Sequence, residues 1–251
     1  MRLDINLYLW CNNVMEYLSE LVDNYQPSEQ TVNLVRSTRL VLLAGISGAG
    51  KDTVKRALIS KNPIFHDIVS HTTRQPRSNN NMLERDGVDY HFIDNYVAEN
   101  MLQAGEFVEA KFVHGTVYGT SVAEIQRARE SGKIAITDID VQGVAEFKEI
   151  TPGAVSIFIV PPAYDTWVER LKSRYATEDE FVAEWPKRRA SSVKELEHAL
   201  NMPYYHFIIN DDLDRAVRVS EEIILRDDVF YEKDNEARIL AHNLLDQIRA
   251  S

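Results

Sequence analysis

The stretch GISGAGKDT, which runs from Gly45 to Thr53, constrains the fold of this chain more than any other feature. An apolar run at residues 40–44 precedes it, and the helix-like segment TVKRALI continues from it. Glycines at positions 45, 48 and 50 let successive backbone N–H groups turn toward one anion, and a following helix adds its positive N-terminal end. The pattern therefore predicts a phosphate-binding loop between a strand and a helix, with Lys51 reaching the outer phosphates.

One position departs from the usual form of this loop. Asp52 stands where a Ser or Thr that contacts Mg²⁺ is expected. The helix dipole favours a carboxylate there, although the carboxylate also faces a polyanion. Because Mg²⁺ prefers oxygen ligands, we predict that Asp52 and Asp138, which ends a later strand, hold the ion. The predicted nucleoside triphosphate site contains the whole loop: Gly45, Ile46, Ser47, Gly48, Ala49, Gly50, Lys51, Asp52 and Thr53.

Composition limits the class of protein. The chain has 251 residues, of which 44% are hydrophobic, enough to bury the core of one domain with a mobile subdomain. Its 28 Lys and Arg residues and 39 Asp and Glu residues give a net charge of −11. That charge argues against broad binding to nucleic acid or to an anionic membrane, but local basic clusters can still bind a small anionic substrate.

Cysteine usage and hydropathy indicate the cellular context. Cys11 is the only cysteine, which argues against a disulfide within the chain and a cysteine zinc site, and fits a reducing compartment. No apolar stretch approaches the roughly 20 residues of a membrane span, and the N-terminus lacks a basic region followed by an apolar block. We therefore expect a cytoplasmic protein without a membrane or nucleic-acid partner.

Apolar runs alternate with helical patterns between about residues 39 and 225. Several of these runs are continuous, as expected when both faces of a parallel sheet are covered. Asp94 is expected to cap one intervening helix, and Thr120 or Ser121 a second. The pattern predicts an α/β fold, a P-loop NTPase-type parallel sheet flanked by helices. The strand candidates are residues 40–44, 68–70, 107–113, 133–137, 154–160 and 206–209.

Amphipathic segments flank this core at both ends. We expect residues 1–38 to form an N-terminal helical extension and linker, and residues 226–251 a C-terminal helical extension, around a domain at residues 39–225. The helices either pack on the body or bind a partner, including a second copy of the chain. The N-terminal helix is expected to be dispensable for chemistry. The apolar positions are Leu7, Trp10, Val14, Tyr17, Leu18 and Leu21, then Ile239, Leu240, Leu244, Leu245 and Ile248.

Further motifs follow the loop in a fixed order. They are SHTTRQPR from Ser70, ERDGVDYHF from Glu84, GEFVE from Gly105, HGTVYGT from His114, DIDVQG from Asp138 and INDDLD from Ile209. In this order they cover roughly residues 39–225, and the chain closely resembles the guanylate kinase family. The resemblance implies the reaction of ATP with GMP to ADP and GDP with Mg²⁺. It also implies an inserted mixed GMP-binding subdomain at about residues 70–120 and a lid at about residues 174–188.

The resemblance further implies which residues bind GMP. Arg74 and Arg77 suit a forked grip on the nucleotide phosphate, and nearby tyrosines add phenolic hydrogen bonds. In the family, the counterpart of Glu109 reads the guanine N1–H and N2–H₂ donors, which adenine does not present. The full predicted GMP set is Ser70, Arg74, Arg77, Glu84, Tyr90, Glu109, Tyr118, Thr120 and Asp140.

Phosphoryl transfer needs in-line positioning and dispersed positive charge more than it needs a base. Arg174 and Arg188 flank the polar segment that matches the family's lid, whose arginines close over the ATP phosphates. Arg189 is an alternative for the second of these positions, and Asn210 is placed near the adenine by resemblance. The predicted catalytic residues are Lys51, Arg74, Arg174 and Arg188.

Two other functions remain open. A kinase of related fold that acts on a phosphorylated sugar also carries a GKD[ST] loop, but it would not need the DGVDYHF segment with Glu109 and Tyr118. An inert guanylate-kinase-like scaffold that binds protein ligands typically lacks an intact P-loop, whereas Lys51 and the lid arginines are present here. Offering GMP, AMP and ribose 1,5-bisphosphate in parallel separates the two kinases.

Overall fold

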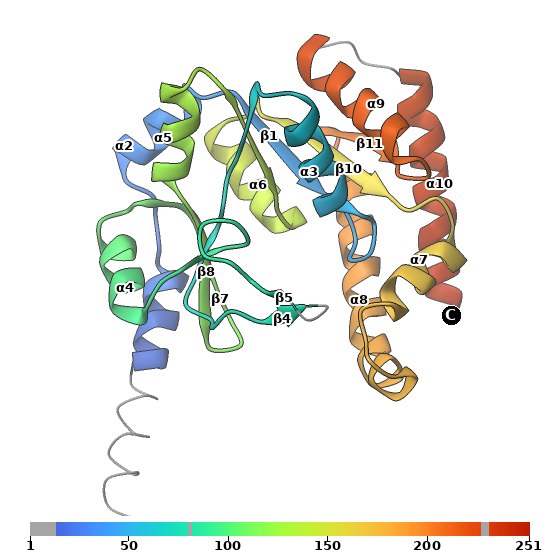
Figure 1. The fold of residues 1–251 in the computed structure, drawn as a ribbon, viewed down its shortest axis with the longest axis horizontal. Helices are drawn as coiled ribbons and strands as arrows, with labels where there is room; N and C mark the ends of the chain where they lie inside the picture. Colours follow the sequence, from blue (N-terminus) through green and yellow to red (C-terminus); the bar gives the residue numbers. More distant parts are fainter. Residues whose placement is uncertain (1–13, 80–81, 227–230) are drawn as a thin grey trace, which may run out of the picture. The chain divides into compact units, whose positions relative to one another are not determined.

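The structure, a computed structural model, describes residues 14–79, 82–226 and 231–251 (Figure 1). Contacts between residues divide the chain into two compact units. Unit 1 comprises Met1–Arg39 and Asp67–Ala135, and unit 2 comprises Leu40–His66 and Ile136–Ser251. The chain therefore crosses from one unit to the other three times.

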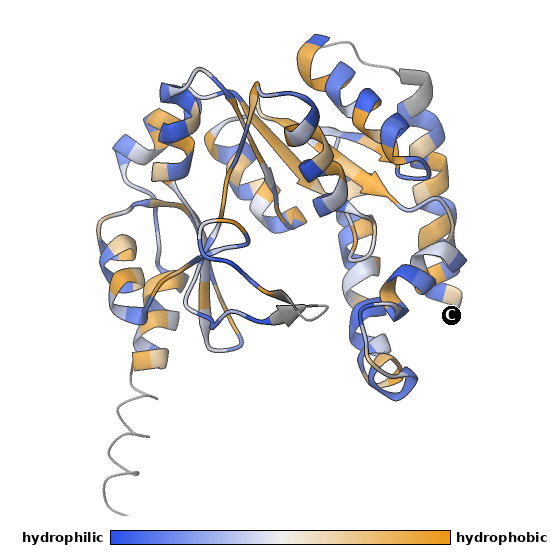
Figure 2. Cartoon of the chain, in the orientation of Figure 1, coloured by the Kyte–Doolittle hydropathy of each residue, from blue (hydrophilic) through white to orange (hydrophobic). Residues whose placement is uncertain are grey.

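Unit 2 is built on a five-stranded sheet in the order β11-β10-β1-β9-β2. The strands are β1 (Leu40–Ala44), β2 (Phe65–Asp67), β9 (Ile134–Asp138), β10 (Val155–Val160) and β11 (Tyr205–Ile209). Strand β10 pairs in parallel with both β1 and β11, and every residue of β1 is buried. The hydrophobic residues of this sheet are coloured orange in Figure 2. The predicted parallel sheet with covered faces is confirmed.

Helices α3 (Lys51–Lys61), α6 (Val141–Ile150), α7 (Tyr164–Lys172), α8 (Glu178–Asn201), α9 (Leu213–Arg226) and α10 (Tyr231–Ala250) complete unit 2. Helix α10 covers strand β11, because Asp234 accepts from the Phe207 N–H and Arg238 donates to the Tyr205 carbonyl. One predicted core position of this helix is wrong, since Ile239 is 62% exposed and Ala237 and Ala241 are buried instead.

Unit 1 contains a four-stranded mixed sheet in the order β6-β3-β8-β7. Strands β3 and β6 are parallel, whereas β8 runs antiparallel to both β3 and β7. Helices and a small hairpin surround this sheet. The elements are α2 (Glu29–Arg36), β3 (His71–Thr72), β4 (Ser78–Asn79), β5 (Met82–Leu83), β6 (His91–Phe92), α4 (Asn95–Gln103), β7 (Phe107–Val113), β8 (Thr116–Ser121) and α5 (Val122–Glu130). The predicted mixed subdomain is confirmed.

Local capping residues mark the starts of two helices in unit 1. Asp94 caps α4 by accepting from the Val97 N–H at 2.8 Å, and Ser121 is the N-cap residue of α5. The strand predicted at residues 68–70 is wrong, because strand β2 lies three residues earlier. Ile68 is nevertheless 1% exposed, so its apolar run reflects burial without strand pairing.

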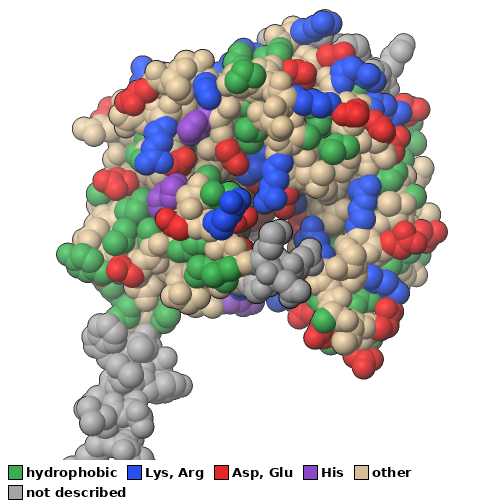
Figure 3. Space-filling view, in the orientation of Figure 1, with side chains coloured by type: hydrophobic (Ala, Val, Ile, Leu, Met, Phe, Trp, Pro, Cys, Tyr) green, Lys and Arg blue, Asp and Glu red, His purple; other side chains and the backbone are tan. Residues whose placement is uncertain are grey.

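The N-terminal extension is helical over residues 14–23. Leu7, Trp10 and Cys11 lie outside the described residues. In the part of the chain that the structure describes, no helix combines the length and the apolar composition that a membrane crossing requires. On the face drawn in Figure 3, Lys and Arg side chains are interspersed with Asp and Glu side chains.

Candidate active site

The predicted phosphate loop connects β1 to the first turn of α3. Gly50 is the N-cap residue of α3 and has a left-handed backbone, with φ of 91°. A Cβ atom at this position would lie 2.3 Å from the Asn210 amide nitrogen, so both conformation and close packing require glycine. Lys51 begins the helix and donates from Nζ to the Gly45 carbonyl at 2.6 Å. The loop thus has the strand, turn and helix order that the motif predicts.

Side chains from distant parts of unit 2 hold the loop in place. Asn210 donates to the Ala49 carbonyl at 2.8 Å, and Trp167 donates from Nε1 to the Ser47 carbonyl at 2.8 Å. Arg174 donates to the Ser47 hydroxyl at 3.2 Å. These three hydrogen bonds stabilise the conformation of the loop with side chains from outside it.

The loop lines a pocket of about 290 Å³. Its walls bring together most residues of the predicted triphosphate site, and Asp140, which was predicted to bind GMP, also lies there. Ala49 is buried and does not line it. A second pocket of about 420 Å³ shares Gly48 and Thr53 and adds Asn210. The first pocket is lined by Gly45, Ile46, Ser47, Gly48, Gly50, Lys51, Asp52, Thr53, Asp138, Ile139, Asp140, Arg174 and Glu195.

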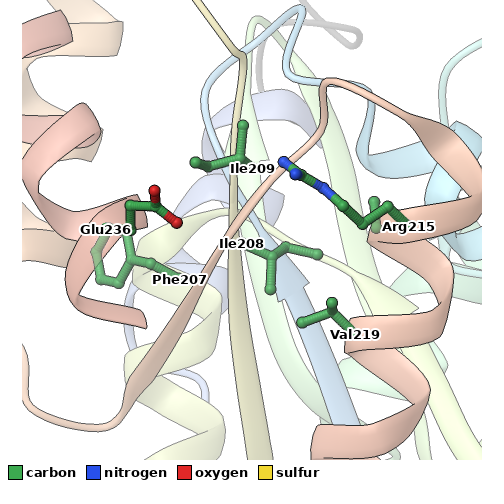
Figure 4. Close-up of a pocket in the computed structure, with 7 residues that line it drawn as sticks. Phe207, Ile208, Ile209, Arg215, Val219 and Glu236 are labelled. Carbon is green, nitrogen blue, oxygen red and sulfur yellow. The ribbon is translucent and has the colours of Figure 1, made fainter. Parts of the chain in front are cut away.

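A smaller pocket of about 80 Å³ lies among β11, α9 and α10. Figure 4 shows Phe207, Ile208 and Ile209 from the strand, with Arg215 and Glu236 on opposite sides. Small-molecule sites usually measure about 300 Å³ or more, so this pocket is too small for a nucleotide. The loop pockets are therefore the candidate site in unit 2.

Two carboxyl groups meet at the predicted metal position. Burial, the charge of Asp138 and a hydrogen bond with Asp138 raise the pKa of Asp52 to about 6. Burial also acts to raise the pKa of Asp138, but the nearby charge of Lys55 and hydrogen bonds from Asp52 and Lys55 outweigh it and lower this pKa. The Lys55 Nζ atom lies 2.6 Å from the Asp138 Oδ1 atom. The cluster therefore combines two hard oxygen donors with a neighbouring ammonium group.

The predicted lid contains the loop before α8 and the first turns of that helix. Arg188 donates to the Tyr175 hydroxyl at 2.9 Å. Arg189 instead donates to the carbonyl of Ile248 in α10 at 2.7 Å. Arg189 therefore anchors the C-terminal helix, which favours Arg188 as the lid residue.

Sequence reasoning missed two side chains that lie at these pockets. Arg170 lines the second pocket, donates to the Asn210 carbonyl at 3.1 Å, and has a buried Nη1 atom without a hydrogen-bond partner among the described residues. Glu195 lines the first pocket, and burial raises its pKa. Helical spacing could have indicated Glu195, which lies seven residues after Arg188 on α8. It gives no signal for Arg170, because Arg174 lies beyond the end of α7.

The predicted phosphate-binding residues of unit 1 form one cluster. Arg74 makes a two-pronged ion pair with Glu84, at 2.6 and 3.0 Å, and its guanidinium lies 4.9 Å from the Tyr90 ring centre. The hydrogen bond from Arg74 lowers the pKa of Glu84. Glu84 also accepts from the Arg77 backbone N–H at 2.8 Å, and the Tyr90 and Tyr118 rings meet edge to face. Glu84 is thus bound to both arginine positions.

The predicted guanine reader lies on the paired strands of unit 1. Glu109 on β7 is opposite Thr120 on β8, and Thr120 donates to its carboxylate at 2.8 Å. The Glu109 side chain is largely buried, so the hydroxyl fixes its orientation. Ser70 contributes its carbonyl, which accepts from the His91 N–H at 2.8 Å.

The sequence matches the family described as guanylate kinase over residues 37–227. It is 38% identical over 190 residues to the guanylate kinase of Syntrophotalea carbinolica, covering 76% of this chain and 86% of that protein. It is 35% identical over 213 residues to that of Legionella pneumophila, covering 84% and 98%. The fold is similar to the crystal structure of guanylate kinase from Anaplasma phagocytophilum, with a TM-score of 0.56, 24% identity, and coverage of 76% of this chain and 87% of that one.

Proposed function

Because the chain belongs to the guanylate kinase family, we propose that it transfers the γ-phosphoryl group of MgATP to GMP or dGMP, releasing ADP and GDP. The observation that carries this proposal is the intact phosphate loop of unit 2, held by three outside donors. Two features of unit 1 support GMP as the acceptor. They are the contacts among Arg74, Tyr90 and Tyr118 and the hydrogen-bonded carboxylate of Glu109.

Unit 2 binds ATP in this proposal. The loop N–H groups and Lys51 surround the β- and γ-phosphates, and Asn210 lies on the adenine side. Arg174 and Arg188 neutralise the charge that develops during transfer. Arg170 joins them, because it lines the same pocket as Arg174.

The acidic cluster fits a magnesium ion. Mg²⁺ is commonly bound by one or two carboxylates together with water and phosphate oxygens. Asp52 and Asp138 supply two such carboxylates beside the loop. When bound, the ion neutralises phosphate charge and orients the γ-phosphoryl group. Asp52 and Asp138 hold that charge next to the phosphates, and Lys55 keeps Asp138 ionised.

Unit 1 binds GMP. Arg74, Arg77, Tyr90 and Tyr118 bind its phosphate, and Glu84 orients Arg74. Glu109 accepts from guanine N1–H and N2–H₂, and the Thr120 hydroxyl holds that carboxylate in place. Ser70 completes the GMP site of unit 1 in this proposal, whereas Asp140 lines the loop pocket of unit 2.

A coupled ADP-release assay tests the function, with GMP, dGMP, AMP, UMP and ribose 1,5-bisphosphate offered in parallel. AMP would place an acceptor against the Glu109 carboxylate, and an unpaired buried polar group costs about 1 to 3 kcal/mol. We expect GMP to be preferred over AMP by at least roughly tenfold from this contact alone. Equal turnover of AMP and GMP would contradict the proposal, and preference for the sugar phosphate would favour the alternative kinase.

The organisation of the chain is part of the same proposal. Residues 39–225 form the kinase domain, and residues 1–38 and 226–251 are its helical extensions. The acidic composition supports a cytoplasmic enzyme that binds small anions and neither nucleic acid nor membrane. The terminal helices leave a homo-oligomer open, which light scattering of the full chain tests.

A further inference from the structure

The described part of the N-terminal extension, residues 14–36, precedes the family match, which begins at residue 37. Its contacts nevertheless group it with the unit that carries the proposed GMP site. Leu18 is 1% exposed and belongs to one hydrophobic cluster with Leu102 of α4 and Phe107 of β7. The extension is therefore part of the core of unit 1.

Tyr25 connects the extension to the start of strand β7. Its hydroxyl donates to the Phe107 carbonyl, and its ring lies edge-on to the Phe107 ring at a centroid distance of 6.3 Å. A tyrosine hydroxyl is protonated at neutral pH, and burial raises the pKa of Tyr25 further. Tyr25 is thus a permanent donor to a backbone atom two residues before Glu109.

A second connection lies at Gly105. Its carbonyl accepts from the Ser28 N–H at 3.0 Å and from the Thr31 hydroxyl at 2.7 Å. Gly105 has a φ of 65°, and a Cβ atom there would lie 2.7 Å from the Ser28 nitrogen. Any other residue would force the extension away from this turn.

Both connections precede an irregularity in β7. Phe107 is opposite Ser121, but Glu109 is opposite Thr120, so the register shifts between Phe107 and Glu109. An extra residue in one strand bends it and changes the direction in which the next side chain points. The extension binds the backbone at residues 105 and 107, immediately before this shift. The direction of Glu109 therefore depends on how that backbone is held.

We propose that Tyr25 is a positioning residue for guanine recognition: its hydrogen bond to Phe107 holds the shifted start of β7 so that Glu109 meets the guanine edge. This inference rests on the proposed function, because it assumes that Glu109 reads guanine. It assigns to the extension a role in substrate selection, where the sequence alone led us to expect that it is dispensable for chemistry.

The test is Tyr25→Phe, which removes the hydroxyl and keeps the ring in the cluster. The acceptors are GMP and IMP, which differ only in the guanine N2 amino group. We expect the ratio of kcat/KM for GMP to that for IMP to fall roughly three- to tenfold, the range for one lost hydrogen bond. KM for MgATP should stay unchanged. Thr31→Val, which removes the bond to Gly105, should move the ratio in the same direction.

Tyr17→Phe is the matched control, because Tyr17 lies in the helix that precedes Tyr25 in the same extension, but its hydroxyl accepts from the exposed Gln103 side chain. It should leave the ratio unchanged. A Tyr25→Phe protein that loses thermal stability but keeps the native ratio would overturn the inference and leave Tyr25 a purely structural residue.

Glu109→Gln separates failure of the inference from failure of the proposed function. If Glu109→Gln lowers the ratio and Tyr25→Phe does not, the function stands and the inference falls. If Glu109→Gln itself leaves the ratio unchanged, Glu109 does not read guanine and both fall. In the double variant, Tyr25→Phe should have no further effect on the ratio, because the two residues act through one contact.

Discussion

Units 1 and 2 balance the charges of their proposed sites in different ways. In unit 2, Asp52 and Asp138 lie together, and the pKa of Asp52 rises to about 6 although Lys55 is next to the pair. In unit 1, Arg74 and Glu84 form a two-pronged pair, and each stabilises the charged form of the other. The acidic pair favours an added cation, whereas the ion pair is satisfied before a ligand binds.

This difference implies that each unit responds to its substrate by a separate route. A cation at the Asp52 and Asp138 carboxylates relieves repulsion within the protein. An anion at Arg74 has to share a guanidinium that Glu84 already holds, which favours the five-donor geometry of arginine over a lysine. Substitutions in one unit should therefore change the kinetics of one substrate and leave the other largely unaffected.

Lys51→Met should have the largest effect. The methionine keeps the length of the side chain but removes the charge that the phosphates meet at the start of α3. We expect kcat to fall about 1,000-fold, as for loss of a charged group that stabilises the transition state. Binding of GMP, measured by calorimetry, should stay within about twofold because unit 1 is untouched.

The control for this variant lies on the same helix. Lys61 ends α3 and pairs with Asp214 on the surface at 2.5 Å. Lys61→Met should retain native kcat. Equal losses in both variants would show that α3 is sensitive to charge as a whole and that the loop lysine has no special role.

Arg74→Lys should have the next largest effect, on the other substrate. A lysine keeps the charge but cannot make the forked contact with Glu84 and a phosphate together. We expect KM for GMP to rise roughly 10- to 100-fold, equivalent to about 1.5 to 3 kcal/mol for a hydrogen bond to a charged group. KM for MgATP should not change. Arg85→Lys, at an exposed position of the same segment, should be neutral.

The same contrast explains how much the sequence could predict. The ATP side follows largely from one contiguous motif, because all the residues at positions 45–53 except Ala49 line the pocket. The apolar runs at β1 and β7 predicted both strands with their observed bounds. Contiguous motifs and apolar runs of this kind can be recognised in a sequence without knowledge of tertiary contacts.

Contacts between residues far apart in the chain could not be predicted from the sequence. Arg74 and Glu84 were predicted as two GMP ligands, and the sequence did not show that they pair with each other across a separation of ten positions. Asp140 was predicted to bind GMP, and the sequence did not show that it also caps α6 by accepting from the Gly143 N–H. No periodicity links Tyr25 to Phe107, because the bond between them spans 82 positions. Such pairs depend on packing that a single sequence does not encode locally.

Asp52→Ala should act through the metal and ATP. Removing one of the two carboxylates weakens the proposed magnesium site, so we expect kcat/KM for MgATP to fall at least about tenfold, or roughly 1.4 kcal/mol, with little change in GMP affinity. Asp165→Ala is the control, since Asp165 also lies in the first turn of a helix, α7, outside the proposed lid. A faster Asp52→Ala enzyme would mean that Asp52 repels the nucleotide instead of binding its metal.

The pH dependence sharpens this prediction. Burial and Asp138 raise the pKa of Asp52 to about 6, so the carboxylate that accepts a cation is progressively protonated as pH falls through 6. KM for MgATP of the native protein should therefore rise between pH 7 and pH 5. The Asp52→Asn protein should lack this inflection, because its amide does not titrate in that range. Identical profiles for both proteins would assign the inflection to another group.

Thr120→Val should have the smallest effect and tests unit 1 most finely. The valine keeps the shape but removes the hydroxyl that donates to Glu109 at 2.8 Å, a bond worth about 1 kcal/mol. We expect KM for GMP to rise roughly fivefold with kcat and KM for MgATP unchanged, and Thr120→Ser to restore the native value.

Thr116 lies on the same strand and donates to the Val113 carbonyl, so Thr116→Val is the matched control. Equal effects at positions 116 and 120 would show that β8 responds to any lost hydroxyl. An effect confined to Thr120 would support Glu109 as the guanine contact, because the Thr120 hydroxyl donates to its carboxylate and the Thr116 hydroxyl donates elsewhere.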